Sequence, residues 1–336
     1  MLYGLVLRIR HLFYDRGWKK TFQPPVPTIC VGNLTVGGTG KTPHVELLLR
    51  LLSFRSVAVL SRGYKRKTKG FRIVGEADTA QTVGDEPLQI ARKFPSVTVA
   101  VDKDRIHGCK ELSDKQVEIV VLDDAFQYRK MKPGLTLVLV DYYRPVFEDR
   151  LLPWGRLRDL PSRISGADAV VVTKSPADVP DDVRAWWRSK LSLREDQPLF
   201  FTRIRYQKAV PVFPDGDPHY LYSQKVILVS GIANDTPLRQ YLSDTYKIVG
   251  RLSFPDHHRY SKRDIRAIAA AARDCPTACL MTTEKDAQRL RDIPSLPPEV
   301  SRRLFYLPIE AVFLSPEEEE NFQSVILAGF SQRAAK

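Results

Sequence analysis

A glycine-rich segment that ends in Gly-Lys-Thr constrains the fold of this chain more than any other feature. A short apolar run at residues 28–31 precedes it, and a helical pattern at residues 43–52 follows it. In a strand–loop–helix of this kind, the backbone N–H groups of the loop and the N-terminus of the helix converge on phosphate oxygens. The loop residues are Gly37, Gly38, Thr39, Gly40, Lys41 and Thr42. The segment therefore predicts a nucleotide-binding phosphate (Walker A) loop.

Two side chains of this loop carry the expected chemistry. The Lys41 ammonium would reach the β- and γ-phosphates, and the Thr42 hydroxyl would bind Mg²⁺. The spacing departs from G-x-x-x-x-G-K-[ST], because Thr35 stands where the first glycine falls. We expect Gly32 and the Gly37–Gly38 pair to supply the flexibility of the turn instead.

A second motif supplies carboxylates. The apolar run at residues 119–122 ends in Asp123 and Asp124, which is the Walker B arrangement. Asp123 would hold Mg²⁺ directly or through water, and Asp124 would lie at the edge where open α/β sheets bind ligands. Such a pair is also typical of a helix cap. Together with Lys41 and Thr42, a metal role is the favoured interpretation.

Apolar runs alternate with helical or loop segments through the first half of the chain. This order predicts an α/β domain with a doubly wound sheet. The further strand candidates are residues 57–60, 97–101, 135–140 and 169–173. Extended segments follow around residues 198–220, and a second strand–loop–helix unit begins at residue 226. We expect a P-loop domain at residues 1–198, and a smaller α/β domain at residues 199–336 that is joined by extended linker strands and closes over the nucleotide.

Charge limits the class of partner. The chain of 336 residues carries 52 Lys and Arg against 39 Asp and Glu, a net charge of +13. This excess predicts an anionic partner: nucleic acid, an acidic membrane surface or a phosphorylated substrate. No zinc finger, ribonucleoprotein motif or helix-turn-helix is evident, so nucleic acid is not expected. The four scattered cysteines fit a reducing cytoplasm.

The N-terminal segment has an amphipathic pattern. Residues 2–13 place apolar side chains at helical spacing, with Arg8, Arg10 and His11 between them. A basic amphipathic helix of this kind lies in a lipid interface or packs on its own domain, and both alternatives stay open. No apolar run approaches the ~20 residues that cross a bilayer.

Five motifs in the same order carry a family resemblance. Residues 31–43 resemble the phosphate loop of the lipid A tetraacyldisaccharide 4'-kinases, which has the form G-N-x-x-x-G-G-x-G-K-T. The other matching stretches are S-R-G-Y-K-R (61–66), G-D-E-P (84–87), D-D-A-F-Q (123–127) and S-F-P-D-H (253–257), with L-L-P (151–153) and T-T-E-K-D (282–286) also in agreement. Two positions depart from the family: Ala125 stands in place of Gly, and Tyr128 in place of His. No role is therefore assigned to position 128.

The resemblance implies a reaction and a location. An ATP-dependent kinase of this family transfers the γ-phosphate to the 4'-hydroxyl of a lipid-anchored glucosamine disaccharide 1-phosphate, the lipid A precursor. We therefore expect ATP and Mg²⁺ as cofactors and no obligate protein partner. The location implied is the cytoplasmic face of the bacterial inner membrane, with the N-terminal helix on its anionic surface.

The resemblance also assigns catalytic residues. It implies that Asp85 is the base that accepts the hydroxyl proton and that His257, from the second domain, orients it, so that catalysis requires domain closure. From the residues alone, Asp85 is equally plausible as the acceptor of an Asx-turn. Asp159 stands where the family often has an acidic residue near the metal, and which of Asp123, Asp124 and Asp159 binds the metal directly is left open.

Substrate contacts are the remaining expectation. The resemblance implies contacts from Arg105, Tyr64 and Gln127. The basic stretch at residues 62–72 is either a solvated hairpin or a site for the substrate's 1-phosphate and anionic lipid headgroups. The main rival is a P-loop nucleotidase that drives a partner protein. A GTP-dependent enzyme of that class would carry N-K-x-D, and residues 172–175, V-T-K-S, lack both the Asn and the Asp.

Overall fold

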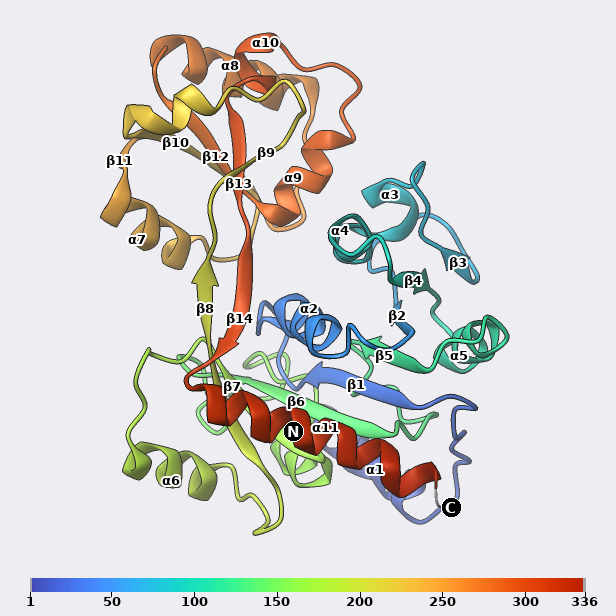
Figure 1. The fold of residues 1–336 in the computed structure, drawn as a ribbon. Coiled ribbons are helices and arrows are strands. Elements are labelled where there is room, and N and C mark those ends of the chain that lie inside the picture. The colour runs from blue at the N-terminus through green and yellow to red at the C-terminus, as the bar shows by residue number, and fades with distance from the viewer. Residues whose placement is uncertain (1, 335–336) are drawn as a thin grey trace.

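The computed structural model describes residues 2–334, which form two sheets with helices packed against them (Figure 1). The larger sheet has nine strands in the order β14-β8-β7-β6-β1-β5-β2-β4-β3. Its strands are β1 (Thr28–Asn33), β2 (Val57–Ser61), β3 (Arg72–Ile73), β4 (Thr98–Val101), β5 (Ile119–Asp123), β6 (Leu135–Asp141), β7 (Ala169–Thr173), β8 (Leu199–Tyr206) and β14 (Ile309–Phe313). All neighbours are parallel except β3 with β4 and β14 with β8. The predicted α/β class is confirmed.

The strands of the larger sheet are apolar on both faces because helices cover both. Alternate residues of β1 point to opposite sides, so Ile29 packs with one hydrophobic cluster and Cys30 with another. The helices on the Ile29 side are α2 (Lys41–Leu51), α4 (Asp85–Lys93) and α11 (Pro316–Ala334). The helices on the Cys30 side are α5 (Arg105–Ser113) and α6 (Asp181–Lys190). The short helix α3 (Ala80–Val83) precedes α4.

The smaller sheet has five strands in the order β11-β10-β12-β13-β9. Its strands are β9 (Val210–Pro211), β10 (Lys225–Ser230), β11 (Lys247–Ser253), β12 (Cys279–Thr283) and β13 (Leu304–Leu307). Its helices are α7 (Thr236–Thr245), α8 (Lys262–Asp274), α9 (Glu284–Arg291) and α10 (Pro298–Ser301). Two 3₁₀ turns, η1 (Pro161–Gly166) and η2 (Pro218–Ser223), complete the described elements.

The connection between the two sheets differs from the expected division at residue 199. Strand β8 leads from the larger sheet to the smaller one and β14 returns beside it, as an antiparallel pair that belongs to the larger sheet (Figure 1). Helix α11 then packs on the larger sheet, where Phe322 and Ile326 join the cluster around Ile29. Residues 309–334 therefore lie with the first domain. Sequence periodicity shows that a segment has a buried face but does not show which sheet buries it.

Helix α1 (Leu2–Asp15) lies on the larger domain and buries Leu7 and His11. Most of its other apolar side chains face solvent. The exposed apolar residues are Leu2, Leu5, Val6, Ile9, Leu12 and Phe13. Within residues 2–334, no helix is long and apolar enough to cross a bilayer.

Candidate active site

The predicted phosphate loop lies between β1 and α2 in the arrangement that its motif requires. Gly37 and Gly40 have φ angles of 101° and 86°, which a residue with a Cβ adopts only with strain. Gly40 is the N-cap of α2, so the loop ends at the N-terminus of a helix. Asn33, at the end of β1, donates from Nδ2 to Thr39 Oγ1 over 2.7 Å and so fixes the base of the loop. This geometry is suited to an anion.

The Lys41 ammonium lies among acceptors on the carboxyl edge of the sheet. It is 3.5 Å from Asn33 Oδ1 and 3.7 Å from Asp124 Oδ1. Arg158 donates to both carboxylate oxygens of Asp124 and to Asn33 Oδ1. Burial acts to raise the pKa of Asp124, but Lys41 and Arg158 hold that pKa below its usual value. Asp124 is thus a paired carboxylate in this structure.

Asp123 has the opposite environment. It is 2% exposed, accepts a 3.0 Å hydrogen bond from Ser61 Oγ on Oδ2, and has no partner for the buried Oδ1 within the described residues. Burial, with the nearby Glu86 and Asp124 carboxylates, raises the pKa of Asp123 to about 7. A buried carboxylate that lacks a cationic partner fits a divalent cation, which would supply the missing charge.

A metal ion at this place would need ligands from outside the protein. Among residues 2–334, no group of three His, Cys, Asp or Glu side chains is arranged to hold a metal ion. Mg²⁺ commonly takes only one or two protein carboxylates and completes its shell with phosphates and waters. The buried Thr42 and Asp123 fit that pattern, together with a nucleotide.

Asp85 and His257 meet across the two domains. Asp85 is the first residue of α4, and His257 lies in the loop between β11 and α8. The His257 Nδ1 atom is 2.9 Å from Asp85 Oδ2. His257 has a φ of 59°, and the ring of Tyr64 packs edge-on against its imidazole at 5.5 Å between centroids. A non-glycine residue in this left-handed conformation is costly, which is typical of functional sites.

The charge on Asp85 is strongly stabilised. Burial acts to raise its pKa, but the hydrogen bond with His257 and the charge of Arg289 hold the pKa far below the usual range. The neighbouring Glu86 pairs with Lys285 of the second domain. The charge of Lys285, with a smaller contribution from Lys41, lowers the pKa of Glu86 although burial opposes it. The turn at residues 84–87 therefore faces both Lys41 and the second domain.

Arg105 is a buried cation beside the same edge of the sheet. It is 4% exposed, its Nε atom has no hydrogen-bond partner within the described residues, and its guanidinium lies 5.4 Å from the ring centroid of Tyr128. Burial, reinforced by the charge of Arg62, lowers its pKa. Tyr128, which replaces the histidine usual in the family, donates its hydroxyl to Asp104 over 2.9 Å. This hydrogen bond holds the ring that Arg105 contacts.

Two of the expected residues have their polar atoms engaged elsewhere. Gln127 donates from Nε2 to the Asn33 carbonyl over 2.6 Å, so its side chain holds the strand before the phosphate loop. Asp159 is 1% exposed and its Oδ1 lies 2.5 Å from His11 Nε2. This carboxylate fastens helix α1 to the domain, and its expected place near the metal stays a prediction.

Sequence reasoning missed several residues that shape the site. Asn33 and Arg158 organise the phosphate loop and Asp124, and Arg289 contacts Asp85. Lys174, in the V-T-K-S segment that was judged only for a guanine motif, donates to Gly38 O and to Asp141 Oδ2. Position gave a signal for two of them: Asn33 ends β1 and Lys174 directly follows β7, at the edge where parallel sheets gather functional side chains.

The chain is similar to known proteins in both sequence and fold. The family model described as Tetraacyldisaccharide-1-P 4'-kinase matches residues 1–330. The tetraacyldisaccharide 4'-kinase of Parabacteroides distasonis is 43% identical, with 99% of this chain and 93% of that protein covered. The enzyme of the same name from Flavobacterium johnsoniae is 40% identical over 97% of this chain and 94% of its own. A crystal structure of LpxK from Aquifex aeolicus in complex with ATP superposes with a TM-score of 0.76 at 30% identity, covering 98% and 96% of the two chains.

Proposed function

Since this chain belongs to the Tetraacyldisaccharide-1-P 4'-kinase family, we infer that its site phosphorylates the 4'-hydroxyl of a tetraacyldisaccharide 1-phosphate in lipid A biosynthesis. It is an ATP-dependent kinase. The observation that carries the assignment is the contact between Asp85 and His257, whose Oδ2 and Nδ1 atoms are 2.9 Å apart. The residue after Asp85, Glu86, is close enough to Lys41 for the lysine charge to lower its pKa. This arrangement supports a proton acceptor and a phosphate-binding lysine on one edge of the sheet.

We propose the following roles for the nucleotide side of the site. The phosphate loop and the N-terminus of α2 hold the triphosphate, with Lys41 on the β- and γ-phosphates. Thr42 and Asp123 hold Mg²⁺, and the unpartnered Oδ1 of Asp123 supports this carboxylate, of the three considered, as the direct ligand. Bound Mg²⁺ neutralises charge on the phosphates. Arg158 keeps Asp124 in place beside Lys41.

On the acceptor side of the site, Asp85 takes up the proton of the 4'-hydroxyl. As the bond between the 4'-oxygen and the γ-phosphorus forms and the bond from that phosphorus to the β–γ bridging oxygen breaks, the hydroxyl proton passes to Asp85. The low basicity of Asp85 is compatible with this role, because in a loose transition state the hydroxyl becomes acidic only as the new bond forms. His257 holds the carboxylate in orientation. Tyr64, packed on His257, borders the place of the acceptor.

The substrate's 1-phosphate needs cations, and we propose Arg105 with the basic stretch at residues 62–72. Arg105 is buried without a carboxylate in hydrogen-bond contact within the described residues, and the charge of Arg62 acts on it. Arg105 is buried whereas Arg62 is exposed, and an anion between these two cations would relieve their mutual repulsion. Such a pair suits a phosphate monoester.

The kinase assignment is tested by transfer of label from γ-³²P-ATP to tetraacyldisaccharide 1-phosphate in mixed micelles with Mg²⁺. We expect label in the lipid, and we expect excess EDTA to abolish it, because the phosphates and Asp123 would then lack their shared cation. A substrate analogue without the 4'-hydroxyl is the control. Steady hydrolysis of ATP without labelled lipid would instead support a nucleotidase.

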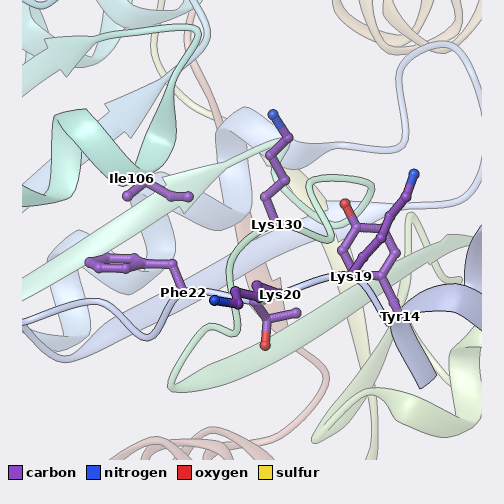
Figure 2. Close-up of a pocket in the computed structure, with 7 residues that line it drawn as sticks. Tyr14, Lys19, Lys20, Phe22, Ile106 and Lys130 are labelled. Carbon is purple, nitrogen blue, oxygen red and sulfur yellow. The ribbon is translucent and has the colours of Figure 1, made fainter. Parts of the chain in front are cut away.

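We propose further that helix α1 places the enzyme on an anionic membrane surface. Six apolar side chains of the helix are uncovered, with Leu2 76% and Leu5 54% exposed. A hollow of about 490 Å³ lies beside the end of the helix, and its lining combines aromatic, apolar and lysine side chains (Figure 2). These are Tyr14, Lys19, Lys20, Thr21, Phe22, Ile106 and Lys130. An apolar helix face next to clustered lysines fits a lipid interface.

Replacing two of the exposed apolar residues tests this placement. Leu5→Ser with Ile9→Ser should weaken partitioning into phosphatidylglycerol-containing vesicles by ~100-fold, since each side chain contributes about 1.5 kcal/mol when it leaves water. Phe54→Ser, at an exposed aromatic residue away from α1, is the matched control and should leave partitioning unchanged. Sedimentation with vesicles measures both. Equal partitioning of all three proteins would contradict the proposal.

A further inference from the structure

Helix α9 of the second domain presents two cations to the two carboxylates of the turn at residues 84–87. Lys285 Nζ pairs with Glu86, and Arg289 pairs with Asp85. Both pairs join residues about two hundred positions apart, and both partners of the Arg289–Asp85 pair are less than a tenth exposed. A buried ion pair between domains is costly unless its geometry is well supported, so the support of Arg289 is informative.

Arg289 is held from behind by residues of its own domain. Its NH1 atom donates to Asp286 Oδ1 over 2.8 Å and to the Gly231 carbonyl over 3.1 Å. Asp286 is fully buried, and its Oδ2 accepts from the Gly231 N–H at 2.9 Å and from Thr283 Oγ1 at 2.7 Å. A Cβ at position 231 would come within 2.8 Å of Asp286 Oδ1, so the glycine makes room for this contact. The segment T-T-E-K-D therefore builds a rigid support for one guanidinium.

The other edge of the guanidinium contacts one oxygen of Asp85. Arg289 Nε and NH2 both donate to Asp85 Oδ2, which is also the oxygen that His257 contacts. Within residues 2–334, no hydrogen bond to Oδ1 of Asp85 is found. With one oxygen fixed by two side chains of the second domain, the carboxylate presents its second oxygen in a defined direction.

We propose that Arg289 is a positioning residue for phosphoryl transfer: fixed by Asp286, it holds Oδ2 of Asp85 so that Oδ1 receives the acceptor proton, and it does so only when the two domains are closed. The proposal rests on the proposed role of Asp85 as the base. It gives the second domain a part in the chemistry besides His257. Arginine suits the task, because its planar fork contacts Asp286 and Asp85 at once, whereas a lysine offers a single charged point.

The charge of Arg289 has two opposing effects on the base. It keeps Asp85 ionised over the whole working pH range, because it lowers the pKa of the carboxyl group together with His257. It also weakens Asp85 as a proton acceptor. In a loose phosphoryl-transfer transition state, the gain from orientation exceeds the loss of basicity, because proton transfer is late.

A double-mutant cycle with Asp85→Asn tests the proposal. Arg289→Gln alone should lower kcat by roughly 10²-fold, the scale for a misplaced reacting group, with KM for ATP unchanged. In the Asp85→Asn background, the same substitution should change kcat by about twofold or less, because its target is gone. Arg289→Lys should restore part of the lost rate. Arg291→Gln is the matched control, since Arg291 lies on the same helix but contacts Val212 O and Tyr306 inside its own domain.

Each outcome is decisive. Equal losses of kcat in the two backgrounds would overturn the proposal, because Arg289 would then act on domain closure and not through Asp85. An unchanged kcat for Arg289→Gln would overturn it as well. If Asp85→Asn itself retained wild-type turnover, the base assignment would fail together with the proposal. Thermal melting identifies a variant that does not fold, and in that case Arg289→Lys decides by the same cycle.

Discussion

Asp85→Asn should lower kcat by about 10²- to 10⁴-fold while the affinity for ATP changes little. The substitution removes a proton acceptor but no ligand of the phosphates. Asp85 lies on α4 and contacts His257 and Arg289, whereas the phosphate loop is held by Asn33 and Lys174. The measurement is single-turnover transfer of label to the lipid, with ATP affinity from a separate binding titration.

The same substitution has a predictable effect on stability. The folded-state pKa of Asp85 is lowered, so its ionised form stabilises the fold fully above the usual carboxyl pKa, and this contribution is lost as the pH falls from that value towards the lowered folded-state pKa. Asp85→Asn should therefore lower the melting temperature at pH 7 more than at pH 3, which lies below the usual carboxyl pKa. Asp274→Asn, at the exposed C-terminal residue of α8, is the control for the chemical change. A variant whose ATP affinity fell in proportion to kcat would place Asp85 among the nucleotide ligands.

Local order explains what could be predicted from the sequence. The phosphate loop, the strand that ends in Asp123 and the α/β class each depend on short segments in which strand, glycines and helix follow one another. The chain positions of Lys41, Thr42 and Asp123 therefore place them on one edge of a parallel sheet. The pairing of Asp85 with His257 came from family resemblance alone, because nothing in either local sequence links two residues 172 positions apart.

Long-range contacts explain what the sequence did not predict. Arg158 holds Asp124 and Asn33 from 34 and 125 positions away, and Arg289 reaches Asp85 over 204 positions. A single basic residue on a helix has no pattern that distinguishes such a role from solvation. The return of β14 and α11 to the first domain has the same cause, since an amphipathic helix shows a buried face but not its partner. The contact of Asp159 with His11 was not predicted either, because 148 positions separate the two residues.

The proposed mechanism also gives the second domain a part in a reaction whose phosphate loop lies in the first. In the first domain alone, the carboxylates of Asp85, Glu86 and Asp123 would crowd one edge of the sheet with Lys41 as a nearby cation. Two cations of helix α9 pair with two of these carboxylates: Arg289 with Asp85 and Lys285 with Glu86. Asp123 remains without a cation among the described residues, so the remaining charge is where we propose Mg²⁺. In the closed arrangement, Asp85 is therefore paired with Arg289 and suits the proposed base, whereas Asp123 is unpaired and suits the proposed metal ligand.

Lys41→Ala should abolish transfer of label to the lipid, with a loss of about 10³-fold or more. The Lys41 ammonium is the cation of the phosphate loop that would stabilise the negative charge of the phosphoryl group in the transition state. The fold should persist, since Arg158 continues to neutralise Asp124 when Lys41 is removed and Gly40 still caps α2. Circular dichroism and thermal melting check this.

Lys190→Ala is the control for removing a lysine: that residue lies at the end of α6, against Trp186 and away from the nucleotide site. It should transfer label at the wild-type rate. Lys41→Ala should also lose the protection against thermal unfolding that ATP with Mg²⁺ gives the wild type, because ligand binding stabilises the fold by mass action. A Lys41→Ala protein that is folded and phosphorylates the disaccharide at more than a tenth of the wild-type rate would remove the phosphate loop from the mechanism, and the site would have to be sought around Arg105 instead.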